Sequence, residues 1–249
     1  MNYIFDVDGT LSFDGETIAK PITDAIRELM AAGNEIVFAS ARPIRDLLPI
    51  IPDFQTQRLI GANGAMISVD QRIQVISQIE ADDYMYLKSL IKKFDLDYVI
   101  DSSWNYATHL TQPSFIEKMI DPGNLAKQVL VSEISEPIKT IFVNVEDDLQ
   151  TKLLSIIKQE TSLNAIGLSG EHTVDVTAQT INKFSTVKKL DISDYVAFGN
   201  DRNDFELLNQ AKSSIWVASK PNLSAYGEQF DSICRPNPES VATMIRSFI

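Results

Sequence analysis

The feature that most constrains the fold is the alternation of short apolar runs with amphipathic segments at both ends of the chain. The apolar runs occupy residues 3–5, 36–39, 195–198 and 214–217. The segments 18–32 and 204–211 between them have apolar residues at helical spacing. Strands that alternate with helices form a mostly parallel sheet with helices on its faces. We therefore predict an α/β fold built on one such sheet.

The middle of the chain follows a different pattern, which predicts a second domain. Two amphipathic helices are expected at 81–94 and 149–160, without the regular strand–helix alternation of the chain ends. Strand-like runs lie at 98–100, 106–108, 138–145, 163–168 and 173–176. We therefore expect residues 1–77 and 180–249 to form the core domain. Residues 78–179 would form an inserted α+β domain.

Charge narrows the range of partners. The chain has 249 residues and a formal net charge of -12. An acidic surface repels the phosphate backbone of nucleic acids and disfavours anionic membranes. We therefore expect neither nucleic acids nor membranes as partners. If the ligand is an anion, a bound metal ion or a few Lys and Arg side chains must offset the negative charge of the protein around it.

Cysteine usage and the apolar runs bear on the compartment. Cys234 is the single cysteine, so no internal disulfide ties the protein to an oxidising compartment. We find no basic segment followed by an apolar run and a cleavage site, and no apolar stretch long enough to span a bilayer. We expect a cytoplasmic protein.

Polar residues with oxygen-bearing side chains lie just after the predicted strands. Asp6 and Asp8 follow the run 3–5, Ser40 follows 36–39, and Asn200 follows 195–198. In open parallel sheets, ligands bind beyond the carboxyl ends of the strands. These residues are therefore expected to share one site.

Asp6 and Asp8 form a pair of neighbouring carboxylates that repel each other unless a cation or a proton intervenes. Mg²⁺ suits such a place, because it prefers oxygen ligands and keeps several waters. One carboxylate can then attack phosphorus, while the other protonates the leaving oxygen and later activates water. An ordinary turn at Asp-x-Asp-Gly is the alternative.

The string Phe5-Asp6-Val7-Asp8-Gly9-Thr10-Leu11 resembles the first motif of the haloacid dehalogenase superfamily. The resemblance implies a Rossmann-like core in which Asp6 is the nucleophile and a metal ligand. It implies that Asp8 is the general acid and base and ligates the metal through its backbone carbonyl. Gly9 and Thr10 would shape the loop around the phosphate.

Ser40-Ala41-Arg42 resembles the second motif, which is usually Thr-Gly-Arg in the Cof-like, or type IIB, branch. The resemblance implies that these three residues contact the phosphate or the substrate. Two alternatives come from the residues themselves. Ser40 can be a helix N-cap, and Arg42 can face the inserted domain or simply pair with a surface acid.

Two further positions fit the same branch. Asn63-Gly64-Ala65 resembles the turn before the inserted cap domain, although a two-residue type I′ hairpin turn also explains it. Lys183 matches the third motif, with Asp175 as the acidic strand residue before it and Phe184 in place of the usual glycine. The resemblance implies that Lys183 holds the nucleophile and the phosphate; a surface lysine is the alternative.

Residues 199–204, Gly-Asn-Asp-Arg-Asn-Asp, resemble the fourth motif, usually Gly-Asp-Gly-x-Asn-Asp. Asn200 stands where the family has a metal-binding Asp. We expect Asn200 to ligate the metal through its amide oxygen, with Asp201 as the alternative ligand. We expect Asp204 to act through a water or by pairing with Lys183, and Asn203 to reach a phosphate oxygen.

Together these residues resemble a type IIB phosphatase whose α/β cap closes over the site, excludes water and selects the leaving group. The resemblance implies Mg²⁺-dependent hydrolysis of a small phosphorylated metabolite, such as a sugar phosphate, through an aspartyl-phosphate. We expect a monomer or weak homodimer. A phosphomutase, a phosphorylated switch protein, or a weakly active phosphate-binding regulatory protein, suggested by Asn200, are the alternatives.

Overall fold

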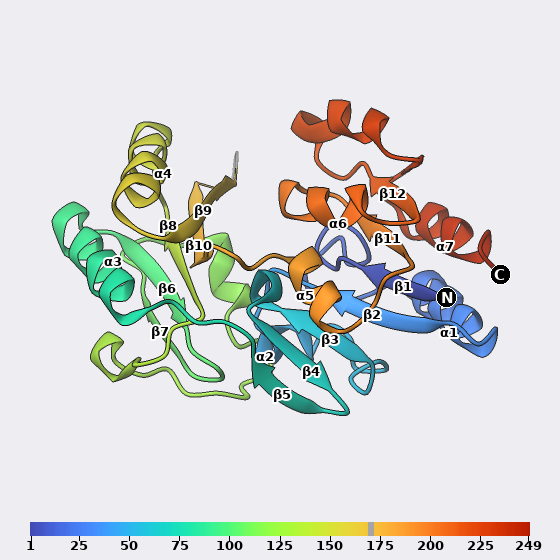
Figure 1. Cartoon of the computed structure of the whole chain (residues 1–249), viewed down its shortest axis with the longest axis horizontal. Coiled ribbons are helices and arrows are strands. Elements are labelled where there is room, and N and C mark those ends of the chain that lie inside the picture. The colour runs from blue at the N-terminus through green and yellow to red at the C-terminus, as the bar shows by residue number, and fades with distance from the viewer. Residues whose placement is uncertain (169–171) are drawn as a thin grey trace. The chain divides into compact units, whose positions relative to one another are not determined.

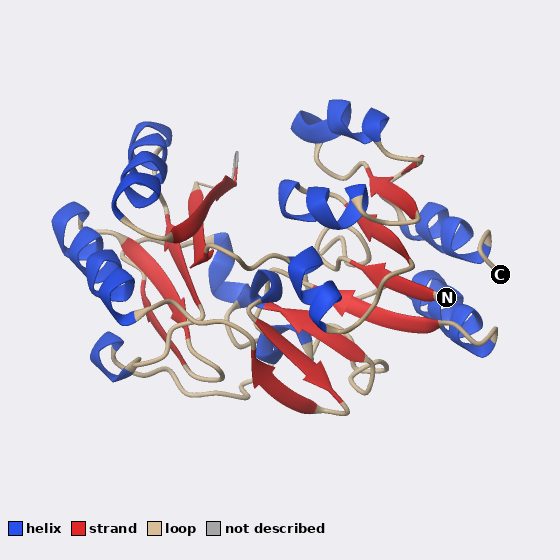
Figure 2. Ribbon diagram, in the orientation of Figure 1, coloured by secondary structure: helices blue, strands red, loops and turns tan. Residues whose placement is uncertain are grey.

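The computed structural model describes residues 1–168 and 172–249 of the chain. The chain folds into two compact units, which Figures 1 and 2 display. The first unit contains Met1–Ile73 and Asn182–Ile249, and the second contains Gln74–Ile181. The role of the second unit as a cap domain stays a prediction.

The first unit is built on an eight-stranded sheet in the order β13-β12-β11-β1-β2-β3-β4-β5. Strands β13 to β3 run parallel, and β4 is antiparallel to β3. This parallel-dominated α/β architecture confirms the predicted fold class. The strands are β1 (Asn2–Phe5), β2 (Glu35–Ala39), β3 (Arg58–Gly61), β4 (Met66–Val69), β5 (Arg72–Val75), β11 (Tyr195–Gly199), β12 (Ser213–Val217) and β13 (Ser232–Cys234).

The centre of this sheet is buried on both faces. The ring of Phe5 in β1 packs against Phe38 in β2 and Phe198 in β11, with centroids 6.4 and 4.8 Å apart. All three side chains are fully buried. Continuous apolar strands of this kind are typical of a parallel sheet covered by helices. Asp6, Ser40 and Asn200 directly follow these three strands.

Helices pack on this sheet as the sequence pattern predicts. The helix expected at 18–32 is α1 (Lys20–Ala31), which has Pro21 in its first turn, where no hydrogen-bonded N–H is needed. α1 packs against α7, and Arg246 of α7 pairs with Glu28. The other helices are α2 (Ile44–Leu47), α5 (Lys183–Lys189), α6 (Phe205–Asn209) and α7 (Pro238–Arg246), with 3-10 segments at Ala62–Gly64, Arg202–Asp204 and Pro221–Gln229.

The second unit has an antiparallel five-stranded sheet in the order β7-β6-β8-β10-β9. Its strands are β6 (Asp97–Asp101), β7 (Tyr106–His109), β8 (Lys139–Val143), β9 (Leu163–Leu168) and β10 (Thr173–Ala178), and its helices are α3 (Ala81–Phe94) and α4 (Asp147–Glu160), with 3-10 segments at Phe115–Met119 and Val131–Glu133. Leu87 of α3 and Leu153 of α4 are buried in one apolar cluster with Phe142 of β8. Both helices therefore form a core with this sheet.

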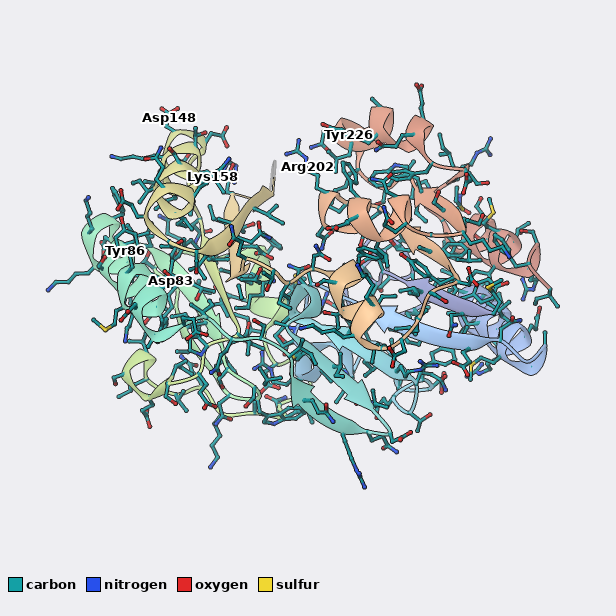
Figure 3. The ribbon with its side chains drawn as sticks, in the orientation of Figure 1. Asp83, Tyr86, Asp148, Lys158, Arg202 and Tyr226 are labelled. Atoms are coloured by element: carbon teal, nitrogen blue, oxygen red, sulfur yellow. The ribbon has the colours of Figure 1, made fainter. Side chains whose placement is uncertain are left out.

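The outer face of α4 carries charged side chains, two of which Figure 3 labels. Asp148 lies in its first turn and Lys158 in its last, and both are exposed. The negative charge lies near the positive N-terminal end of the helix dipole and the positive charge near its negative C-terminal end, so both interactions are favourable. In the described ranges, no helix is both long and apolar enough to cross a membrane.

Gly64 lies close to the backbone of Asn182, the residue that caps α5. Its φ is +106°, and a Cβ there would lie 2.4 Å from the Asn182 carbonyl oxygen. We expect Gly64→Ala to lower the free energy of unfolding by about 2 kcal/mol or more, because both the backbone angle and the neighbouring backbone oppose a side chain.

Gly33 is the matched control for this substitution. It also has a positive φ, +84°, but no other group lies within 4 Å of the position that a Cβ would occupy. Gly33→Ala is expected to cost only about 1 kcal/mol, the backbone part of the effect. Urea denaturation of both variants measures the difference, and equal costs would show that the contact with Asn182 is unimportant.

Candidate active site

Lys183 joins two carboxylates in the buried centre of the candidate site. Its Nζ lies 2.5 Å from Asp6 Oδ1 and 2.7 Å from Asp204 Oδ1. Lys183 and Asp204 side chains are fully buried, and that of Asp6 is 6% exposed. Asn182 caps α5 by accepting a hydrogen bond from Ser185 N, which places Lys183 in the first turn. The lysine therefore fixes the loop after β1 to the segment after β11.

Electrostatics in this triad leave an excess of negative charge. Burial raises the pKa of Asp6 to about 7, the charge of Asp204 adds to this, and Lys183 opposes it. Burial alone would lower the pKa of Lys183, but the charges of Asp204 and Asp6 raise it above its ordinary value. Lys183 is therefore a fixed positive charge, and one positive charge faces two carboxylates.

Thr10 and Asn200 complete the surroundings of Asp6. The Thr10 hydroxyl lies 2.8 Å from Asp6 Oδ2 and 3.2 Å from Asn200 Oδ1. Asn200 Nδ2 donates to Ser219 Oγ at 2.7 Å, so its amide oxygen faces Thr10 and Asp6. Gly9, with φ +79°, leaves room for this amide, because a Cβ there would lie 2.2 Å from Nδ2.

The oxygen atoms around Thr10 fit a magnesium ion bound by few protein ligands. In the described part of the chain, no group of three or more His, Cys, Asp or Glu side chains could hold a metal. Asp6 and Asn200 nevertheless turn oxygen atoms toward one hydroxyl. Mg²⁺ accepts carboxylate and amide oxygens and retains waters, and its charge would offset the buried excess. Asp6 and Asn200 could therefore hold such an ion, and the Asp8 carbonyl as a further ligand stays a prediction.

Asp204 and Asp201 have other partners in the protein. Asp204 Oδ2 accepts hydrogen bonds from the backbone N–H groups of Asn200 and Asp201, at 3.0 and 3.2 Å. Asp201 accepts from Arg202 N with one oxygen and from Lys220 with the other. Both carboxylates therefore stabilise the conformation of the loop after β11. Asp204 is in addition paired with Lys183. This arrangement favours Asn200 over Asp201 as a metal ligand, although the choice remains a prediction.

Arg42, in the loop after β2, forms an ion pair with Asp8. Arg42 donates to both oxygens of the Asp8 carboxylate, at 2.9 and 2.6 Å. Ser40 Oγ accepts from Arg42 N at 3.0 Å, and Ala41 between them is half-buried. The N-cap of α2 is Pro43, so the alternative of Ser40 as a helix cap is wrong. Ser40 Oγ is an acceptor in this bond, and the phosphate contacts expected of these residues stay predictions.

The two asparagines at the edge of the site bind each other. Asn203 Nδ2 donates to Asn63 Oδ1 at 2.9 Å, which links the loop after β3 to the loop after β11. This bond uses one of the two N–H donors of the Asn203 amide, and the expected contact of Asn203 with a phosphate oxygen stays a prediction. Asn63 lies in a four-residue loop, since Gly61 pairs with Met66, so a two-residue type I′ turn is wrong here.

Sequence reasoning did not single out two residues that the site uses. Ser219 orients the Asn200 amide, and the Gly15 carbonyl accepts from Arg42 Nη2 at 2.8 Å. Ser219 follows β12 closely, so the rule that polar residues after strands form the site would have found it. Gly15 contributes only its backbone, and no pattern in the sequence marks it. Asp175 is the acidic strand residue that the third motif places before Lys183. It pairs with Lys139 in the second unit.

Comparison with known proteins assigns the chain to a family. Residues 3–225 match the family described as haloacid dehalogenase-like hydrolase. The protein belongs to this family.

Individual relatives are distant in sequence but cover nearly the whole chain. A protein of Streptococcus pyogenes, named as a candidate phosphatase, is 21% identical over 98% of this chain and 96% of its own length. A haloacid dehalogenase-like hydrolase from Bacillus subtilis has the same fold, with a TM-score of 0.83, 15% identity and coverage of 100% and 99%. The subclass IIB sugar phosphatase BT4131 has a TM-score of 0.80, 21% identity and coverage of 99% and 98%.

Removing the lysine charge tests the triad. Lys183→Met would leave Asp6 and Asp204 buried without their common partner. We expect the free energy of unfolding in metal-free buffer to fall by about 3–5 kcal/mol, which is typical when one member of a buried ion pair is removed.

Lys220→Met is the control, since the Lys220–Asp201 pair is part-exposed and such pairs contribute about 1 kcal/mol or less. Chemical denaturation of both variants, monitored by circular dichroism, gives the comparison. A cost for Lys183→Met no larger than that for Lys220→Met would contradict the triad as a stabilising element.

Proposed function

We propose that this protein is a Mg²⁺-dependent phosphomonoester hydrolase that forms an aspartyl-phosphate on Asp6. The observation that supports this most directly is the position of the Asp6 carboxylate. It lies at the carboxyl end of β1 between the Lys183 ammonium and the Thr10 hydroxyl, next to the Asn200 amide oxygen. A carboxylate held by a fixed cation at a sheet edge suits attack on a phosphoryl group.

The chemistry proceeds in two balanced steps. In the first, an Asp6 oxygen forms a bond to phosphorus, the bond to the leaving oxygen breaks, and that oxygen takes its electron pair and a proton from Asp8. In the second, Asp8 removes a proton from water, the water oxygen bonds to phosphorus, and the bond to Asp6 breaks. Inorganic phosphate leaves and both carboxylates return to their initial states. Bound Mg²⁺ would neutralise phosphoryl charge throughout.

The substrate we propose is a small phosphorylated metabolite, in particular a sugar phosphate. A structural neighbour is named as a sugar phosphatase, and sequence relatives are named as candidate phosphatases. We assign selection of the leaving group to the second unit, in the role of a cap domain, and catalysis to the first. The net charge of -12 argues against nucleic-acid substrates. We propose a cytoplasmic protein that acts as a monomer or weak homodimer.

Asn200 favours one alternative, a weakly active phosphate-binding protein. It stands where the family motif has an acid and lowers the negative charge available to a cation. A phosphomutase shares the same covalent intermediate, and a product assay with an acceptor sugar phosphate distinguishes it. Hydrolysis remains the better proposal, since Asp6, Asp8 and Lys183 are all present.

Asp6→Asn tests the nucleophile. The substitution is nearly isosteric, so we expect a folded protein whose turnover of p-nitrophenyl phosphate falls by about 10³-fold or more. Acid-quenched samples of the unmodified protein should contain a phosphorylated species by mass spectrometry, and the variant should contain none. Substantial residual turnover in a folded Asp6→Asn protein would refute the assignment.

Asn200→Asp tests the metal ligand. Adding one carboxylate should lower the Mg²⁺ concentration for half-maximal activity by about tenfold, equivalent to about 1.4 kcal/mol. Asp201→Asn is the matched control and should leave this concentration unchanged, because the Asp201 carboxylate already has two partners in the loop. The reverse result, with only Asp201→Asn affecting the titration, would identify Asp201 as the ligand.

A further inference from the structure

The guanidinium of Arg42 holds the carboxylate of Asp8 with both of its oxygens. Nε donates to Oδ2 at 2.9 Å, and Nη2 donates to Oδ1 at 2.6 Å. A second hydrogen on Nη2 bonds the Gly15 carbonyl at 2.8 Å. A bidentate contact fixes both the position and the plane of a carboxylate, whereas a single donor does not fix its plane.

Arg42 is itself rigidly held. Its side chain is only 4% exposed, whereas that of Asp8 is 32% exposed. Its backbone N–H donates to Ser40 Oγ at 3.0 Å, and its carbonyl accepts from Ala62 N at 2.7 Å. The buried arginine is thus the fixed partner, and the part-exposed aspartate is the group whose orientation it determines.

We propose that Arg42 is a positioning residue that orients Asp8 for proton transfer to the leaving oxygen. This inference rests on the proposed function, in which Asp8 is the acid. When one Asp8 oxygen carries the transferable proton, the other still accepts from Arg42. The carboxyl group therefore keeps its orientation when it is protonated, and reaction rates depend steeply on such orientation.

Direct binding of the substrate phosphate is the other use that an arginine here would have. Nη1 is buried and has no hydrogen-bond partner among the residues that the structure describes, so one donor nitrogen is left for a phosphate oxygen. The other two nitrogens are engaged by Asp8 and Gly15. The contacts therefore favour action through Asp8, and the experiment below separates the two roles.

The test is a double-mutant cycle with a series of substituted phenyl phosphates that differ in leaving-group acidity. The variants are Arg42→Lys, Asp8→Asn and the double substitution. Lysine keeps the charge but not the planar fork. We expect Arg42→Lys to lower kcat/KM about 10–100-fold for the least acidic phenols, and much less for p-nitrophenol, which departs without a proton.

On the Asp8→Asn background, Arg42→Lys should have little further effect, since the group it orients is gone. Equal losses across the phenols, or losses that add to those of Asp8→Asn, would overturn the proposal. So would a loss confined to KM together with weaker inhibition by inorganic phosphate, which would show a phosphate ligand instead.

Arg45→Lys is the matched structural control. Arg45 is another buried arginine of the same segment, and it holds both oxygens of Asp46, at 2.6 and 2.8 Å. Its substitution should lower thermal stability without changing the dependence of kcat/KM on the leaving group. A change in that dependence equal to that of Arg42→Lys would overturn the proposal.

The wild type and Asp6→Asn are assayed first, so that the two proposals fail separately. If the wild type does not hydrolyse the phenyl phosphates, or Asp6→Asn hydrolyses them equally, the proposed function fails and the role of Arg42 fails with it. If turnover depends on Asp6 but the cycle is additive, only the role of Arg42 fails.

Discussion

The arrangement of the first unit depends on one buried interaction, the contact of Lys183 with Asp6 and Asp204. Asp6 belongs to the first strand of the chain, while Lys183 and Asp204 follow the second unit in sequence. Burying three charges is unfavourable unless they are paired at close range. The sheet order brings them together, because β1 and β11 are neighbours and their carboxyl ends lie at the same edge. The triad in turn fixes the loops that carry the rest of the site.

The charge balance of the triad gives a physical reading of Asn200. Two carboxylates around one ammonium already leave an excess negative charge in a buried place. Burial, and after it the charge of Asp204, raises the pKa of Asp6. An acid in place of Asn200 would add a third negative charge beside Asp6 and make the metal-free site harder to stabilise. In the proposed metal site, Asn200 would supply an oxygen ligand without this cost. Its amide nitrogen also donates a hydrogen bond to Ser219 Oγ. A carboxylate at this position could only accept a hydrogen bond from Ser219.

The sequence predicts the parts of the fold that obey strong local rules. Apolar runs followed by polar residues located β1, β2 and β11. Thr10 after β1 contacts both Asp6 and Asn200, and Arg42 after β2 contacts Asp8. The short strand β13 was missed, because three residues that include Ser232 give no periodicity. The contact of Arg42 with Asp8 could not be predicted either, since it joins side chains of two loops whose relative position follows from sheet order. Local patterns locate strand ends, and tertiary packing decides which side chains touch.

Three aspartates of the site differ because each has a different environment. Asp204 is fully buried, and its two oxygens accept from Lys183 and from backbone N–H groups, which suits a structural acid. Asp6 is nearly buried but shares Lys183, so its charge is less completely offset, which suits the proposed nucleophile. Asp8 is partly exposed and held from one side by Arg42, which suits the proposed acid that meets a leaving oxygen and water. In the proposed mechanism, burial and the choice of cation thus give chemically identical side chains different tasks.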